Sequence, residues 1–295
     1  MGLLPGEQVA LGDKPGARLR PCQEDMFISI LSPAEITRYV RHLTLEGWGR
    51  EAQERVKSSR ALIVGAGGLG STAAMHLLAA GVGALRLVDN SRVNLAGLGH
   101  QMLFREQDLG KAKAAAAERR LKDLNSFTLV ESLVKVLSPH NVSRLTSDCQ
   151  VLIDATNNSP AGLILNEAAA KLHLPLVSAW VWNMDGCLTT YWPGQGPCLT
   201  CSYQETYNSG PPALLSPLPG ILGALQGLEA LRILGGLGAA LLGRLLYFHG
   251  SSFHFTEKPL KTNPRCPTCQ AQGRIRQCSD KPPGILKTCK PPMRG

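Results

Sequence analysis

The amino-acid sequence predicts an α/β protein with a doubly wound, mostly parallel β-sheet. Between residues 60 and 180, short apolar runs typical of buried strands alternate with longer stretches of helical composition. After Asp185-Gly186 the pattern changes, because residues 187–192 alternate like an antiparallel strand and residues 248–255 form a candidate partner for it. We therefore expect a parallel sheet that continues into an antiparallel C-terminal part.

The elements follow from local signals. Ser32 is a suitable N-cap, Pro33 fits the first helical turn and Glu35 stands in capping-box position, which predicts a helix up to about residue 44. Further helices are expected over 51–57, 71–80, 111–124 and 161–172. Strands are expected over 61–64, 85–89, 127–136, 150–154 and 174–180.

The most informative motif is Gly-Ala-Gly-Gly-Leu-Gly at 65–70, directly after the apolar run 61–64. Asp89 follows at the end of the next apolar run. In such a unit the first glycine permits a tight turn, the second lets a phosphate approach the backbone, and the third lets the helix pack on the strand. The following helix offers free N–H groups and the positive end of its dipole. These features predict a Rossmann-like nucleotide-binding unit; the alternative is a glycine-rich turn that binds nothing.

Composition and charge divide the chain into three parts. The 295 residues are 44% hydrophobic and 18% charged, which suits one large core or one and a half domains. Residues 271–295 contribute +5 of the net charge of +9 and are rich in proline. We expect a weakly ordered extension over 1–31, a nucleotide-binding domain over 32–270, and a flexible basic tail over 271–295. The tail is either a solvated appendage or a contact for an acidic partner or for nucleic acid, and we expect no specific nucleic-acid binding.

The sequence predicts a cytoplasmic protein without a membrane segment. Residues 1–32 mix acidic and basic side chains and lack an apolar signal-peptide core. The uncharged stretch over 206–228 is interrupted by four prolines and several glycines, which disfavours a membrane helix. In a reducing compartment, the nine cysteines indicate metal binding or chemistry before disulfides.

Two C-x-x-C pairs indicate a metal site. Cys198 and Cys201 form one pair, and Cys266 and Cys269 form the other, each in a proline-rich turn setting. Four converging thiolates are the ligand set of a structural zinc ion, whereas a single pair is also compatible with redox chemistry. Two pairs in one chain favour zinc. Cys149 and Cys187 have no matching spacing and are predicted to be small buried residues.

Several motifs together resemble the ThiF/MoeB/HesA family, over about residues 31–270. The shared patterns are R-Y-x-R at 38–41, the glycine motif with Asp89, G-x-x-K at 110–113, D-x-T-x-N at 154–158, L-Q-x-x-E-A at 225–230 and the paired C-x-x-C. The resemblance implies a doubly wound domain that uses Mg²⁺ and ATP to adenylate the C-terminal glycine carboxylate of a small ubiquitin-like sulfur carrier ending in Gly-Gly. Such carriers serve molybdopterin or thiamin synthesis. The resemblance also implies a homodimer, or a heterodimer with a homologue, and a structural zinc ion.

The resemblance assigns roles to particular residues. It places the glycine motif on the phosphates, Asp89 on the ribose, and positive charge at Lys113 and at Arg41, which is expected to reach the other subunit's site. The implied catalytic residues are Arg41, His100, Lys113 and Asn157. The implied ATP-binding residues are Gly65, Gly67, Gly68, Gly70, Asp89, Gly97, His100, Lys113, Asn157 and Asn158. The implied metal ligands are Cys198, Cys201, Cys266 and Cys269.

The chain departs from the family pattern at charged positions. Gly97 and His100 stand where N-L-x-R-Q has asparagine and arginine, and histidine replaces a fixed bidentate cation poorly. Asn157 stands where the family has the aspartate that supports magnesium, so the site lacks that charge. Gly162 replaces a further arginine, and Ser209 lies where some members have a catalytic cysteine. Arg92, Arg105 or a partner subunit are candidates for compensation.

Three functions therefore compete. The first is an adenylyltransferase with an altered site, which would lose about 2–4 kcal/mol of transition-state stabilisation for each missing group. The second is a catalytically degenerate member that acts as a binding or partner subunit. The third is an NAD-dependent oxidoreductase, which the paired C-x-x-C, G-x-x-K and L-Q-x-x-E-A segments disfavour.

Overall fold

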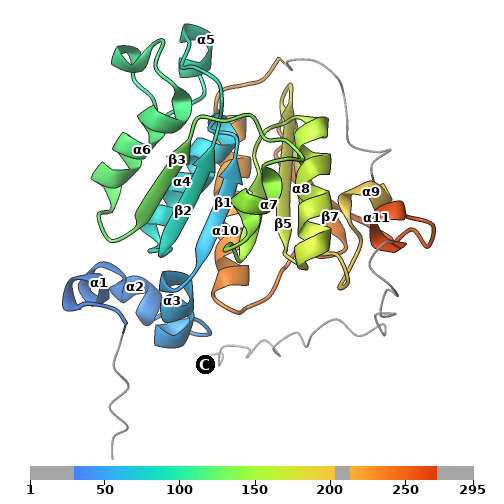
Figure 1. The fold of residues 1–295 in the computed structure, drawn as a ribbon, viewed down its shortest axis with the longest axis horizontal. Coiled ribbons are helices and arrows are strands. Elements are labelled where there is room, and N and C mark those ends of the chain that lie inside the picture. Colours follow the sequence, from blue (N-terminus) through green and yellow to red (C-terminus); the bar gives the residue numbers. More distant parts are fainter. Residues whose placement is uncertain (1–29, 203–212, 271–295) are drawn as a thin grey trace, which may run out of the picture.

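The computed structural model describes residues 30–202 and 213–270, which form an α/β domain around one eight-stranded sheet (Figure 1). The strand order is β3-β2-β1-β4-β5-β6-β7-β8. The first five strands in this order pair in parallel and the last three pairings are antiparallel, which confirms the predicted fold class. The strands are β1 (Arg60–Val64), β2 (Ala84–Val88), β3 (Leu129–Leu133), β4 (Val151–Asp154), β5 (Leu176–Trp182), β6 (Asp185–Tyr191), β7 (Arg244–His249) and β8 (His254–Pro259).

Helices cover both faces of the sheet, as a doubly wound fold requires (Figure 1). One face packs against α4, α6 and α10, and the other packs against α7 and α8. The helices are α1 (Pro33–Arg38), α2 (Val40–Leu43), α3 (Gly49–Lys57), α4 (Gly68–Ala79), α5 (Leu95–Leu98), α6 (Lys113–Leu124), α7 (Val142–Thr146), α8 (Ser159–Leu172), α9 (Leu199–Ser202), α10 (Pro217–Leu234) and α11 (Pro267–Gln270), with a 3₁₀ turn η1 (Glu106–Asp108).

The first predicted helix is correct at its start and wrong in its length. The capping box between Ser32 and Glu35 is present. However, the helix ends at Arg38, and Tyr39, with φ −100° and ψ 15°, separates α1 from α2. The Tyr39 ring is buried beside Gly81 and its hydroxyl accepts a hydrogen bond from Asn125 Nδ2 at 2.9 Å. Burial of this aromatic side chain therefore accompanies the break that helical propensity alone did not indicate.

The expected strand over 248–255 is also wrong, because the chain reverses within it. Strand β7 ends at His249 and β8 begins at His254, and the two pair antiparallel with Phe248 opposite Phe255. Phe253 in the turn has a positive φ of 52°. The expectation that this region pairs with residues 187–192 is confirmed for β7, since Cys187 lies opposite Tyr247.

Helix α10 is held tightly against α4 and the sheet. A Cβ added at Gly223 would lie 2.5 Å from the carbonyl oxygen of Leu69, so the two helices meet at backbone distance. Gln226 Nε2 donates to the carbonyl of Asp154 at 2.8 Å. Glu229 Oε1 accepts from Leu241 N at 2.8 Å and from Thr190 Oγ1 at 2.9 Å. The polar residues of the L-Q-x-x-E-A segment thus attach this helix to the sheet.

Other expectations have mixed outcomes. Cys149 and Cys187 are buried, as predicted, and burial raises the pKa of each thiol to about 12. The proposed extension, the basic tail and Ser209 lie outside the described residues, so the domain boundaries stay predictions. Within the described part of the chain, no helix combines the length and hydropathy needed to cross a membrane.

The close approach of α10 to α4 leads to a stability prediction. Gly223→Ala should lower the free energy of unfolding by about 1–3 kcal/mol, because its methyl group would overlap the backbone of Leu69. Gly220→Ala is the matched control, since a Cβ at Gly220 meets nothing within 4 Å. Because alanine favours the helix more than glycine does, this variant should raise the free energy of unfolding by about 0.5–1 kcal/mol. Urea denaturation monitored by circular dichroism measures both. Equal stability of the two variants would contradict the proposed contact.

Candidate functional site

A cavity of about 490 Å³ lies at the carboxyl ends of β1, β2 and β4. This is where open parallel sheets bind ligands, and the volume is in the range of small-molecule sites. The predicted site residues Gly65, Gly67, Gly68, Asp89, His100, Lys113, Asn157 and Asn158 line it. Further lining residues include Gln101, Lys135, Val136, Leu137, Thr156, Pro160, Ile164, Val181 and Pro219. The fold therefore brings most of the predicted ATP-binding residues together.

The glycine motif forms a tight turn from β1 into α4. Gly65 has φ +98°, and a Cβ there would lie 2.6 Å from the carbonyl oxygen of Ala155. A Cβ at Gly70 would overlap the carbonyl of Gly65. Gly67 is the N-cap of α4 and no side chain caps this helix. The amino end of α4 therefore faces the cavity with backbone N–H groups suited to an anion.

Asp89 ties the end of β2 to the glycine motif. Its Oδ2 accepts from Ala66 N at 2.7 Å. Its Oδ1 accepts from Ser91 N at 2.7 Å and from Ser91 Oγ at 2.6 Å. These bonds fix the carboxylate in the cavity wall, beside the glycine turn, where the sequence placed it.

Three basic side chains line the cavity. Lys113 is the first residue of α6, and His100 lies over the glycine motif, with its ring and carbonyl within 3.2 Å of the position of a Cβ at Gly68. Burial, with a smaller contribution from Lys113, lowers the pKa of His100, so the ring is neutral at pH 7. Lys135, two residues beyond β3, also lines the cavity. Sequence reasoning missed it, although a lysine just past the end of a parallel strand was the available signal.

Gln101 is the polar neighbour of His100. Its Nε2 lies 3.3 Å from His100 Nε2, which suits a neutral ring that accepts a hydrogen bond. Gln101 Oε1 is buried and has no hydrogen-bond partner among the described residues. Rotation of the amide by half a turn would present Oε1 to a protonated ring, so either charge state of His100 has a partner.

Asn157 is bound to the backbone of β5. It has φ +53°, its Nδ2 donates to Val181 O at 3.1 Å, and its Oδ1 accepts from Val181 N at 3.1 Å. Asn158 is the N-cap of α8, and its Oδ1 accepts from Ala161 N. Both amide side chains therefore stabilise the turn from β4 into α8, and both residues also line the cavity.

Asp154 begins this turn and is completely buried, outside the cavity lining. Its Oδ1 accepts from Thr156 N at 3.1 Å and Thr156 Oγ1 at 2.7 Å. Burial raises the pKa of Asp154 to about 6, against the effect of these hydrogen bonds. Its position under the turn makes it a support for Asn157 and Asn158.

Other predicted site residues lie outside the cavity lining. Gly70 supports helix packing, and Gly97 packs against Asn94 and Gln101. Arg41 is exposed on α2, which precedes α3 and lies near the amino ends of the strands (Figure 1). Arg92 and Arg105 do not line the cavity either, and Arg92 Nη1 donates to Gly110 O at 2.6 Å.

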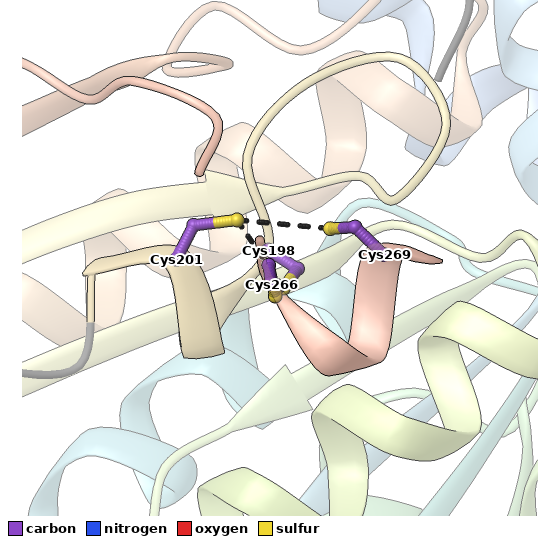
Figure 2. A group of neighbouring side chains, drawn as sticks. All are labelled: Cys198, Cys201, Cys266 and Cys269. Atoms are coloured by element: carbon purple, nitrogen blue, oxygen red, sulfur yellow. Dashed lines mark hydrogen bonds between the residues drawn. The ribbon is translucent and has the colours of Figure 1, made fainter. Parts of the chain in front are cut away.

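The four predicted cysteine ligands converge at a second site (Figure 2). Cys201 belongs to α9 and Cys269 to α11, and the two pairs are brought together from distant parts of the chain. All four sulfur atoms lie within 4.8 Å of one another. Neighbouring Sγ–Sγ distances are 3.5 Å for Cys198–Cys266, 3.6 Å for Cys201–Cys269 and 3.7 Å for Cys198–Cys201.

This geometry fits a tetrahedral metal site. Four sulfurs about 2.3 Å from a zinc ion stand about 3.8 Å from one another. The hydrogen bond between Cys198 and Cys201 raises the pKa of the first thiol and lowers that of the second to about 5. Nearby, Thr200 and Thr268 hydroxyls are 3.0 Å apart, and Asn166 contacts both Leu199 N and Thr200 Oγ1, which fixes the two pairs against α8.

Comparison with known proteins places this arrangement among related sequences. The chain is 38% identical over 257 residues to the adenylyltransferase and sulfurtransferase MOCS3 of Drosophila persimilis, covering 85% of this chain and 57% of the relative. It is 35% identical over 249 residues to the SAMP-activating enzyme E1 of Haloferax volcanii, covering 82% of this chain and 92% of the relative. The chain thus spans little more than half the length of the fly relatives and nearly all of the archaeal one.

Solved structures share the fold. The structure of E. coli MccB with MccA-N7isoASN matches with a TM-score of 0.72 and 21% identity, over 82% of this chain and 76% of that one. The structure of PaaA matches with a TM-score of 0.70 and 24% identity, over 80% and 77%. The ThiF family profile matches residues 39–269, from Tyr39, which directly precedes α2, to Cys269, the last of the four clustered cysteines. This chain therefore belongs to the ThiF family.

Proposed function

We propose that this chain is an ATP-dependent adenylyltransferase that activates the C-terminal carboxylate of a small ubiquitin-like sulfur carrier. One observation carries the proposal: the glycine turn, Asp89 and Lys113 line one cavity in a ThiF-family chain. The printed names of its relatives, adenylyltransferase and sulfurtransferase MOCS3 and SAMP-activating enzyme E1, support the same reaction. The proposed carrier ends in Gly-Gly and serves sulfur transfer of the molybdopterin or thiamin type.

The cavity provides separate surroundings for the parts of ATP. The amino end of α4 and the ammonium of Lys113 are suited to the phosphates. Asp89, with its oxygens fixed by Ala66 and Ser91, is suited to the ribose hydroxyls. Val136, Leu137 and Ile164 give the cavity an apolar surface suited to the base.

In the proposed reaction, a carrier carboxylate oxygen bonds to the α-phosphorus while the bond to the pyrophosphate oxygen breaks. The products are an acyl adenylate and pyrophosphate. Because both reactants are anions, the chain must hold them together and neutralise the charge that develops on the leaving group. In this proposal the N–H groups at the start of α4 and the ammonium group of Lys113 hold the phosphates and neutralise the charge that develops on the pyrophosphate.

Magnesium does not fit as a protein-held ion in this cavity. Asp89 is the one carboxylate among the described lining residues, and hydrogen bonds engage both its oxygens. Asn157 Oδ1, in the predicted magnesium position, accepts from Val181 N. We therefore derive no step through a metal held by these side chains.

Zinc fits the cysteine cluster, and we propose that it is the metal bound there. The ion would join Cys198 and Cys201 to Cys266 and Cys269 and so pin the end of the domain onto α9. It would stabilise the fold without taking part in the reaction.

We further propose a cytoplasmic dimer in which Arg41 reaches the partner's site, because its own cavity lies at the other end of the sheet.

A second candidate is a binding or partner subunit without turnover. It is favoured by His100, which is neutral, and by Asn157, whose amide is occupied. ATP–pyrophosphate exchange in the presence of candidate carriers ending in Gly-Gly separates the two. Carrier-dependent exchange supports the adenylyltransferase, whereas ATP and carrier binding without exchange supports the binding subunit. Tighter binding of NAD than of ATP would instead revive the oxidoreductase interpretation.

His100 gives the site a predicted pH dependence. Its ring is neutral in the free protein because burial lowers its pKa, and a bound phosphate should raise that pKa by favouring the charged form. ATP should therefore bind more tightly as pH falls from 8 to 6, by about 1 kcal/mol or about fivefold. Isothermal titration across this range measures the effect. His100→Gln should retain only the dependence that ATP's own protonation causes; an unchanged slope would contradict the role of His100.

The cysteine cluster predicts a metal-dependent fold. Cys201→Ser should reduce bound zinc below one ion per chain and lower the thermal midpoint by several degrees, because a ligand of the cross-link is lost. Cys187→Ser is the control, since this thiol is buried in the core away from the cluster and should leave the zinc content unchanged. Elemental analysis by mass spectrometry and calorimetry check both. Full zinc content in Cys201→Ser would rule out a four-cysteine site.

A further inference from the structure

In the candidate ATP cavity, the side-chain oxygens of Asp89, Asn157 and Asn158 accept hydrogen bonds from the protein itself. Asp89 receives three hydrogen bonds from Ala66 and Ser91. Asn157 Oδ1 accepts from Val181 N, and Asn158 Oδ1 accepts from Ala161 N. A hard cation such as Mg²⁺ requires oxygen ligands at about 2.0–2.1 Å, preferably charged ones. Asp89 is the one carboxylate among the described lining residues, and the proposed function uses its remaining lone pairs for the ribose hydroxyls, so no further carboxylate is left for the cation.

Both polar atoms of the Asn157 amide form hydrogen bonds within the protein. It donates through Nδ2 and accepts through Oδ1 at the same residue of β5, at 3.1 Å each. A carboxylate at this position lacks the donor and would face the Val181 carbonyl. The asparagine thus suits a turn that is closed by hydrogen bonds and does not suit one that ligates a metal.

The cavity has positive charge instead. Lys113 and Lys135 both line it, and neither forms an ion pair within residues 30–202 and 213–270. Lys135 N and Asp89 N both donate to the carbonyl of Leu133, at 3.0 and 3.1 Å, so the backbone of the second lysine is anchored next to Asp89. Metal-free ATP carries more negative charge than ATP bound to magnesium. Two ammonium groups therefore complement the metal-free polyphosphate better than the magnesium-bound one.

We propose that the cavity binds the ATP phosphates directly through Lys113 and Lys135, without a protein ligand to magnesium, so that ATP affinity does not require Mg²⁺. The inference rests on the proposed function, because it concerns the same ATP site. It assigns Lys135 as a phosphate-binding residue that supplies positive charge in place of the arginine that the family pattern has at position 100. It also makes Asn157 a positioning residue for the turn between β4 and α8.

Isothermal titration of the full chain with ATP tests the proposal, once with EDTA and once with excess MgCl₂. We expect dissociation constants within about threefold of each other. Binding that is tighter with Mg²⁺ by more than this factor overturns the inference and leaves the proposed function intact. Absence of ATP binding under both conditions overturns the proposed function itself.

Variants test the individual residues in the same assay. Lys135→Gln should weaken metal-free ATP binding by about tenfold and leave adenosine binding unchanged. Lys171→Gln, which makes the same charge change at an exposed site in the last turn of α8, should bind ATP like the wild type. Asn157→Asp should weaken metal-free binding and make the affinity depend on Mg²⁺. Wild-type ATP affinity in Lys135→Gln would overturn the role of this lysine.

Discussion

The close packing of backbone around the glycine turn is the constraint on which the site depends. The carbonyl of Gly65 leaves no room for a side chain at Gly70, and the carbonyl of Ala155 leaves none at Gly65. Where α10 packs against α4, Gly223 meets the carbonyl of Leu69. Strand β1, helix α4, the β4–α8 turn and helix α10 therefore hold one another at backbone distance. Because such contacts cannot relax by rotamer change, the amino end of α4 is fixed relative to the cavity wall.

This constraint gives the L-Q-x-x-E-A segment a structural meaning. Gln226 binds the carbonyl of Asp154 at the end of β4, and Glu229 binds Leu241 N and Thr190. The helix that closes over the glycine turn is thus attached to the same strand whose end supplies Asn157 and Asn158. Residues far from any ligand set the positions of those that line the cavity.

Sequence reasoning predicted the features that depend on local pattern. The alternation of strands and helices, the glycine turn with Asp89, and the two C-x-x-C pairs are local or have recognised spacing, and all appear as expected. The break at Tyr39 and the reversal at 250–253 were missed because they depend on tertiary burial and on a positive φ at Phe253. Lys135 was missed because only the strand order places the end of β3 at the cavity.

The two departures from the family pattern acquire different meanings in the structure. His100 lies at the glycine turn beside Gln101, whose amide can accept from or donate to its ring, which is the position that the proposed contact with a phosphate requires. Asn157 instead closes a hydrogen-bonded pair with Val181 that an aspartate cannot form. Restoring the family residue at 100 would add charge to an existing wall, whereas restoring it at 157 would first break the turn that holds Asn158. The hydrogen-bonded pair at Asn157 and the absence of a carboxylate at this position are therefore two aspects of one residue choice, and in the proposed site Lys135 supplies positive charge for the polyphosphate.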